Sequence, residues 1–107
     1  MIMCAFSKNT LCLGGNNKIS FNFDIAKAVS YDELAVVMLK IPSGVKFNEN
    51  VFGVDTDGRI KWQVEKIFPE SDDSPYVDIL KFSDGLYAIN WSGVRTKINL
   101  DTGKVIH

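Results

Sequence analysis

Short segments in which apolar and polar residues alternate, each ended by a turn sequence, dominate the second half of this chain. In segment 59–65 the apolar residues Ile60, Trp62 and Val64 alternate with polar ones, and segment 94–100 repeats the pattern. Alternation with a period of two is typical of a β-strand with one buried face, and turns containing glycine between such strands indicate hairpins. The sequence therefore predicts an antiparallel meander over this half.

Loop length decides which residues face each other across these hairpins. The sequence Thr56-Asp57-Gly58 suits a three-residue loop, because the third position of that loop is left-handed and favours glycine. This register pairs Val54 with Ile60 and Phe52 with Trp62.

Two-residue loops are predicted for the next two hairpins, at Asp84-Gly85 and at Ser92-Gly93. Both place the aromatic and aliphatic residues on one buried face, with Arg95 and Lys97 on the solvent face. A last turn at 101–103 leads into 104–107. The expected pairs are Phe82–Tyr87, Leu80–Ile89, Trp91–Val94, Ile89–Thr96 and Tyr87–Ile98.

The N-terminus predicts a hairpin of segments 2–6 and 11–13, which pairs Phe6 with Leu11, Ala5 with Cys12 and Cys4 with Leu13. Cys4 and Cys12 then point to opposite faces, because side chains alternate along a strand, and cannot form a disulfide. We expect free, packed thiols, the alternative being a redox or nucleophilic role.

The rest of the first half predicts two strands, at 18–23 and at 34–41, where the apolar run ends at Pro42. Residues 24–29 have the apolar spacing of a short helix, which Asp24 would cap. Segments 42–50 and 66–75 are predicted loops. The expected fold is a single all-β domain over residues 1–107, an antiparallel meander closing as a sandwich or partly open barrel with at most one short helix.

Composition restricts the function. The chain has 107 residues, is 46% hydrophobic, and carries 12 basic against 13 acidic residues, without the basic excess typical of a nucleic-acid binder. Its one histidine, His107, is the last residue, which argues against histidine-based catalysis and most metal sites. The N-terminus lacks the pattern of a secretory signal, and no apolar run is long enough to span a membrane, so we expect a soluble, cytoplasmic protein.

Segment 84–104 runs from Asp84-Gly85 through an aromatic strand and a second glycine turn to Asp101-Thr102-Gly103-Lys104. This order resembles a blade repeat of the pyrroloquinoline-quinone-type β-propellers, in which a tryptophan follows the last hairpin. Trp62 holds that position after an earlier copy of the turn, and His107 holds it after this one. A propeller needs at least about four blades, so the quinone site is not transferred to any residue here; the resemblance implies a blade-like meander and no cofactor.

An acidic segment is the first candidate site. Residues 70–78 contain four acidic side chains and no lysine or arginine. Such a segment offers a docking surface for a protein partner with a basic surface, the alternative being a solvated loop. The residues concerned are Glu70, Asp72, Asp73 and Asp78.

A second candidate site is the polar face of the last strands. Asn90, Arg95 and Lys97 share that face in the predicted register, and Arg59 and Lys61 lie on that of the earlier hairpin. They form either solvated surface or a site for a small anion. The sequence Asp55-Thr56-Asp57-Gly58 lacks the later glycine and glutamate of a calcium loop, so we expect a hairpin turn and no metal.

No nucleophile, histidine and acid set can be built from this sequence. We therefore expect a non-enzymatic protein-binding module, similar in size and character to the small immunity proteins that neutralise bacterial toxins. The alternative is a small-ligand or anion-binding β domain using Asn90, Arg95 and Lys97. An enzyme using carboxylates alone, and the completion of a propeller-like ring by several copies, are further alternatives.

Overall fold

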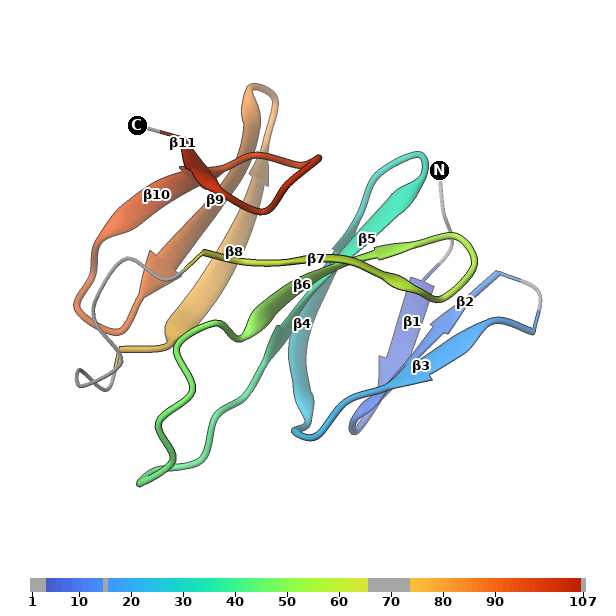
Figure 1. Ribbon diagram of the computed structural model, residues 1–107, viewed down its shortest axis with the longest axis horizontal. Helices are drawn as coiled ribbons and strands as arrows, with labels where there is room; N and C mark the ends of the chain where they lie inside the picture. Colours follow the sequence, from blue (N-terminus) through green and yellow to red (C-terminus); the bar gives the residue numbers. More distant parts are fainter. Residues whose placement is uncertain (1–3, 15, 66–73, 107) are drawn as a thin grey trace.

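The computed structural model describes residues 4–14, 16–65 and 74–106. Within these ranges the chain forms eleven strands and no helix, arranged in three antiparallel sheets (Figure 1). The first sheet contains β1 (Cys4–Ser7), β2 (Thr10–Leu13) and β3 (Lys18–Ser20). The second contains β4 (Ile25–Ser30), β5 (Leu34–Leu39), β6 (Val51–Asp55) and β7 (Ile60–Gln63). The third contains β8 (Tyr76–Phe82), β9 (Gly85–Asn90), β10 (Arg95–Ile98) and β11 (Val105–Ile106).

Each sheet is a meander, because strands that follow one another in sequence are neighbours in the sheet. Figure 1 shows the second sheet standing between the first and the third. The all-β prediction is confirmed, and the sheets are stacked, none of them being closed into a barrel. The radius of gyration is 13.0 Å, close to the value of about 13 Å expected for a domain of 100 residues. No helix long and apolar enough to cross a membrane occurs in the described ranges.

Strand β5 is the centre of the fold, and each of its six residues is buried. Leu34, Val36 and Met38 belong to a core cluster shared with the third sheet, while Ala35 and Val37 belong to a cluster shared with the first. A strand covered on both faces is apolar throughout rather than alternating. This confirms the predicted buried strand, which ends at Leu39 rather than at Ile41.

The N-terminal hairpin has the predicted register. Cys4 faces Leu13, Ala5 faces Cys12 and Phe6 faces Leu11. Cys12 is a free, half-buried thiol.

The short helix predicted at 24–29 is wrong, because Ile25–Ser30 forms strand β4 and pairs with β5. An isolated helix of this length is marginal, whereas pairing with β5 satisfies the backbone and packs Ala28 and Val29 against the two core clusters. The strand predicted at 18–23 is also shorter than expected and ends at Ser20.

The hairpin of β6 and β7 follows the prediction only near its turn. Val54 faces Ile60, as predicted, and Gly58 has a φ of 83°. An irregularity next to that pair then places Trp62 opposite Gly53, so the predicted Phe52–Trp62 pair is wrong. Trp62 thereby joins the core shared with the third sheet, while Ile60 is 49% exposed.

The third sheet differs from the predicted registers in both of its main hairpins. Phe82 faces Gly85 across a two-residue loop, Ser83-Asp84, so Leu80 faces Tyr87 rather than Ile89. This shift of two residues keeps Leu80, Tyr87 and Ile89 on one common face, as predicted.

The next hairpin is displaced by one residue, which exchanges the faces. The Asn90 backbone N–H donates a hydrogen bond to the Val94 carbonyl oxygen. The loop therefore has three residues, Trp91-Ser92-Gly93, rather than the predicted two, Ser92-Gly93. The pairs are therefore Arg95–Ile89, Thr96–Ala88, Lys97–Tyr87 and Ile98–Leu86. Leu86 and Ala88 point to the core, and Tyr87 and Ile89 point outward with Arg95 and Lys97.

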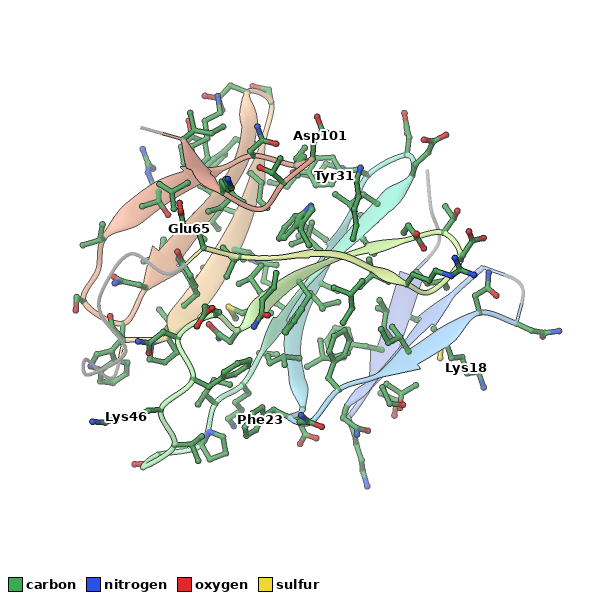
Figure 2. All side chains as sticks on the ribbon, viewed as in Figure 1. Lys18, Phe23, Tyr31, Lys46, Glu65 and Asp101 are labelled. Atoms are coloured by element: carbon green, nitrogen blue, oxygen red, sulfur yellow. The ribbon has the colours of Figure 1, made fainter. Side chains whose placement is uncertain are left out.

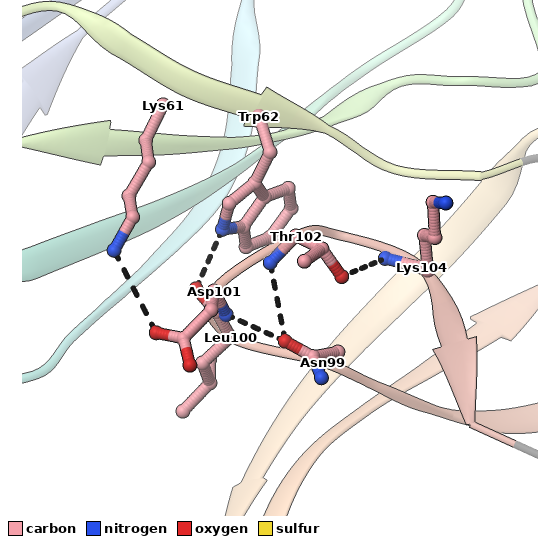
Figure 3. Close-up of polar contacts among 7 residues, drawn as sticks. All are labelled: Lys61, Trp62, Asn99, Leu100, Asp101, Thr102 and Lys104. Atoms are coloured by element: carbon pink, nitrogen blue, oxygen red, sulfur yellow. Dashed lines mark hydrogen bonds and ion pairs between the residues drawn. The ribbon is translucent and has the colours of Figure 1, made fainter.

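Trp62 connects the second and third sheets. Its indole Nε1 donates a 2.7 Å hydrogen bond to the carbonyl oxygen of Leu100 (Figure 3). A Cβ atom added to Gly53 or Gly103 would lie 2.3 Å or 2.5 Å from the ring. Both positions therefore need glycine for the indole to approach the two backbones.

The turn that contacts Trp62 is shaped by Asn99. Its side-chain oxygen accepts hydrogen bonds from the backbone N–H groups of Asp101 and Thr102, at 2.8 Å and 3.1 Å. Asp101 also lies 3.7 Å from the Lys61 ammonium group (Figure 3). This pair is exposed, so we attribute the junction to the indole rather than to the charges.

Candidate functional site

The acidic segment is only partly within the described ranges. Glu70, Asp72 and Asp73 lie outside them. Asp78 is in strand β8, where one carboxylate oxygen lies 3.0 Å from the Lys27 ammonium group and accepts the Ile79 backbone N–H at 2.9 Å. Asp78 therefore joins β8 to β4.

Asn90, Arg95 and Lys97 do not share one face, so the predicted grouping needs correction. Asn90 is fully buried, donates to the Ser74 hydroxyl at 2.9 Å and accepts the Val94 backbone N–H at 2.9 Å. Its side chain shapes the β9–β10 turn from inside. Arg95 and Lys97 lie on the opposite face of the same sheet.

We name this opposite surface the outer face. Cross-strand pairing arranges it in two rows, one containing Leu80, Tyr87, Lys97 and Ile106 and the next containing Asp78, Ile89 and Arg95. Figure 1 shows that the third sheet stands at one end of the stack, with no further sheet beyond it in the described part of the chain. The outer face consists of Asp78, Leu80, Phe82, Tyr87, Ile89, Arg95, Lys97 and Ile106.

Tyr87 is the centre of the contacts on the outer face. The Phe82 ring meets it edge to face, with centroids 5.4 Å apart. The Arg95 guanidinium carbon lies 5.1 Å from the Tyr87 ring centroid, a cation–π distance. The Lys97 stem lies against Gly85, where an added Cβ would be 2.8 Å from the lysine Cε.

One hydrogen bond joins Tyr87 on this surface to the carboxylate of Asp84. The Tyr87 hydroxyl donates to Asp84 Oδ2 at 2.8 Å. This bond lowers the pKa of Asp84, because it stabilises the carboxylate, and raises the pKa of Tyr87. The outer face and Asp84 thus combine the cations Arg95 and Lys97 with two carboxylates, of which Asp78 is paired with Lys27 of β4.

The remaining predicted residues lie elsewhere. Lys61 contacts Asp101, and Arg59 is exposed beyond the β6–β7 turn. Asp55 accepts the backbone N–H groups of Asp57 and Arg59 at 2.9 Å and 3.0 Å, so it serves as a hairpin cap, as expected. No group of three or more metal-ligating side chains was found among the described residues.

Sequence reasoning missed Tyr87 and Ile89 because a displacement of one residue assigned them to the core. A signal was present. Asn90-Trp91-Ser92-Gly93 has the same form as Asp55-Thr56-Asp57-Gly58, with a polar cap three residues before a glycine. Both segments make three-residue loops with a left-handed glycine.

Comparison with curated proteins and with solved structures finds none that matches this chain. A family model described as "Domain of unknown function (DUF7957)" matches residues 1–107. The chain therefore belongs to the DUF7957 family.

Proposed function

We propose that this protein is a non-enzymatic protein-binding module and that its outer face is the interface. The observation that carries the proposal is the contact of Arg95 and Phe82 with Tyr87 on a sheet face that no other described element covers. Arginine and the aromatic residues are the types enriched in interface cores and binding hot spots.

The form of the face supports a protein partner over a small ligand. The outer side chains project from paired strands, so little conformational entropy is lost when a partner binds. Four pockets among the described residues are lined by residues other than Tyr87 and Arg95.

The charge of the face favours an acidic patch on the partner. Asp78 is paired with Lys27, so Arg95 and Lys97 outweigh the remaining acid, Asp84. Complementary charges accelerate encounter and fix orientation. The acidic segment at 70–78 would instead meet a basic surface, so the two surfaces make opposite predictions about the partner.

We propose a bacterial toxin as the partner, met in the cytoplasm. The support is the size and character of the chain, which are similar to those of immunity proteins. Co-expression with the product of the neighbouring reading frame tests this identity. If that product arrests growth, the protein should restore growth and co-purify with it. Growth arrest without a complex would reject the toxin as the partner.

The interface is tested by the only two arginines in the chain, Arg95 on the outer face and Arg59 outside it. Arg95→Glu should weaken partner binding by about tenfold or more in calorimetry. Arg59→Glu is the matched control and should bind as the unchanged protein does. Equal effects of the two substitutions would contradict the proposed interface.

Anion binding is the second candidate function, favoured by the two cations that Arg95 and Lys97 place side by side on β10. Calorimetry against phosphate, nucleotides and sugars, with Arg95→Gln as the control, tests it. An absence of heat from all of these probes would reject it.

A further inference from the structure

We propose that the pocket lined by Phe21, Phe23, Phe47 and Phe52 binds a small, uncharged aromatic molecule. The pocket has a volume of about 510 Å³ and lies where the end of β3, the 42–50 segment and strands β6 and β7 meet. It is separate from the outer face, which belongs to the third sheet, so this inference does not depend on the proposed function.

Four phenylalanine rings line the pocket in a continuous chain of contacts. Phe21 and Phe52 have centroids 5.3 Å apart, Phe52 and Phe47 are 6.5 Å apart, and Phe47 and Phe23 are 5.7 Å apart. Phe21 and Phe52 are buried and form the base, whereas Phe23 and Phe47 are only partly buried. The outer two rings are stacked at 29° and leave aromatic surface available to a further ring.

The rim supplies hydrogen-bonding groups without negative charge. Ser20, Asn22 and Gln63 line the pocket, and no acidic residue does so among the described residues. Lys46 contributes to the wall, but its side chain extends away from Phe23 (Figure 2). Lys46 is the one charged residue of the lining as described, and transfer of an ion into an aromatic pocket is costly, so a neutral molecule is favoured.

The dimensions agree with a small-molecule site. Ligand pockets typically measure about 300–1,000 Å³ and combine apolar walls with a few polar groups. This pocket has that volume and that lining. A ligand of one or two fused rings with one polar group, such as a phenol or an indole, fits this chemistry.

The test uses indole as the probe, followed by ¹H–¹⁵N NMR of the full chain. Indole should bind saturably and shift the resonances of residues 20–23, 45–47 and 60–63. Benzoate, which carries a negative charge, should bind at least about tenfold more weakly. Phe47→Ala should weaken indole binding about fivefold or more, because it removes one wall.

Two further variants make the result decisive. Ile60→Trp adds volume at the exposed rim and should abolish binding without loss of the folded spectrum. Phe82→Ala removes an exposed aromatic ring from the third sheet and should leave indole binding unchanged. The proposal is overturned if indole does not bind saturably, if benzoate binds equally well, or if Ile60→Trp binds indole as the unchanged protein does.

Discussion

Asn50 and Tyr76 are joined by two hydrogen bonds of 2.8 Å, one in each direction. The Asn50 side-chain nitrogen donates to the Tyr76 carbonyl oxygen, and the Tyr76 backbone N–H donates to the Asn50 side-chain oxygen. The same Asn50 nitrogen donates to the Leu39 carbonyl oxygen at 2.8 Å. Both Asn50 and Tyr76 are buried. One side chain thereby holds the start of β8 against the second sheet.

Asn50→Ala should destabilise the protein by about 3 kcal/mol, because it leaves several buried backbone groups without partners. Urea denaturation followed by circular dichroism measures the change. Asn22→Ala, at an exposed asparagine, is the control and should change stability by less than about 0.5 kcal/mol. Similar urea midpoints for Asn50→Ala and Asn22→Ala would show that the hydrogen bonds of Asn50 do not stabilise the fold.

Gly53→Ala should cost about 2 kcal/mol or more, because the new methyl group overlaps the Trp62 indole. In a Trp91→Phe background, the fluorescence of Trp62 should shift to the red as the ring becomes hydrated. Gly14→Ala is the matched control, since an added Cβ at Gly14 meets nothing within 4 Å. An unshifted spectrum in Gly53→Ala would contradict the contact.

Removal of the hydroxyl group should change the stability of the protein in opposite directions at two tyrosines, Tyr31 and Tyr76. The Tyr31 hydroxyl is buried and has no hydrogen-bond partner among the described residues, so Tyr31→Phe should be neutral or stabilising by up to about 1 kcal/mol. The Tyr76 hydroxyl donates to the Glu65 carbonyl oxygen at 2.8 Å, and Tyr76→Phe should cost about 1 kcal/mol. Thermal denaturation of both variants measures their stabilities. A larger loss of stability in Tyr31→Phe than in Tyr76→Phe would contradict the prediction.

Alkaline pH should destabilise the fold through Tyr76, because burial raises its pKa from 10.0 to about 12. Below pH 10 the phenol is protonated in both the folded and the unfolded states and contributes no pH dependence. Between about pH 10 and 12 the unfolded phenol ionises first, so the free energy of unfolding falls by up to about 2 kcal/mol.

Tyr76→Phe should remove this part of the alkaline loss. The measurement is the free energy of unfolding from pH 9 to 12, compared between the two proteins. If the free energy of unfolding falls with pH equally in both proteins, the loss of stability does not come from Tyr76.

Local patterns predicted the elements better than their partners. The N-terminal register and the Val54–Ile60 pair followed from alternation and loop chemistry, which act over a few residues. The helix prediction at 24–29 failed because strand pairing with β5 outweighs the weak preference of a short segment. Of the candidate site, Arg95 and Lys97 were identified from sequence, whereas Tyr87 was assigned to the core.

Sequence by itself determined that this chain is all-β, that its strands form antiparallel meanders, and where most turns lie, because a period of two and turn glycines are local properties. Tertiary structure decided which face is buried in the strands whose pairing is displaced. The loop after Asn90 and the irregularity beside Gly53 each displace the pairing by one residue, which exchanges the two faces. Trp62 fits only where Gly53 and Gly103 leave room. The register of β9 and β10 places Tyr87 on the surface beside Arg95.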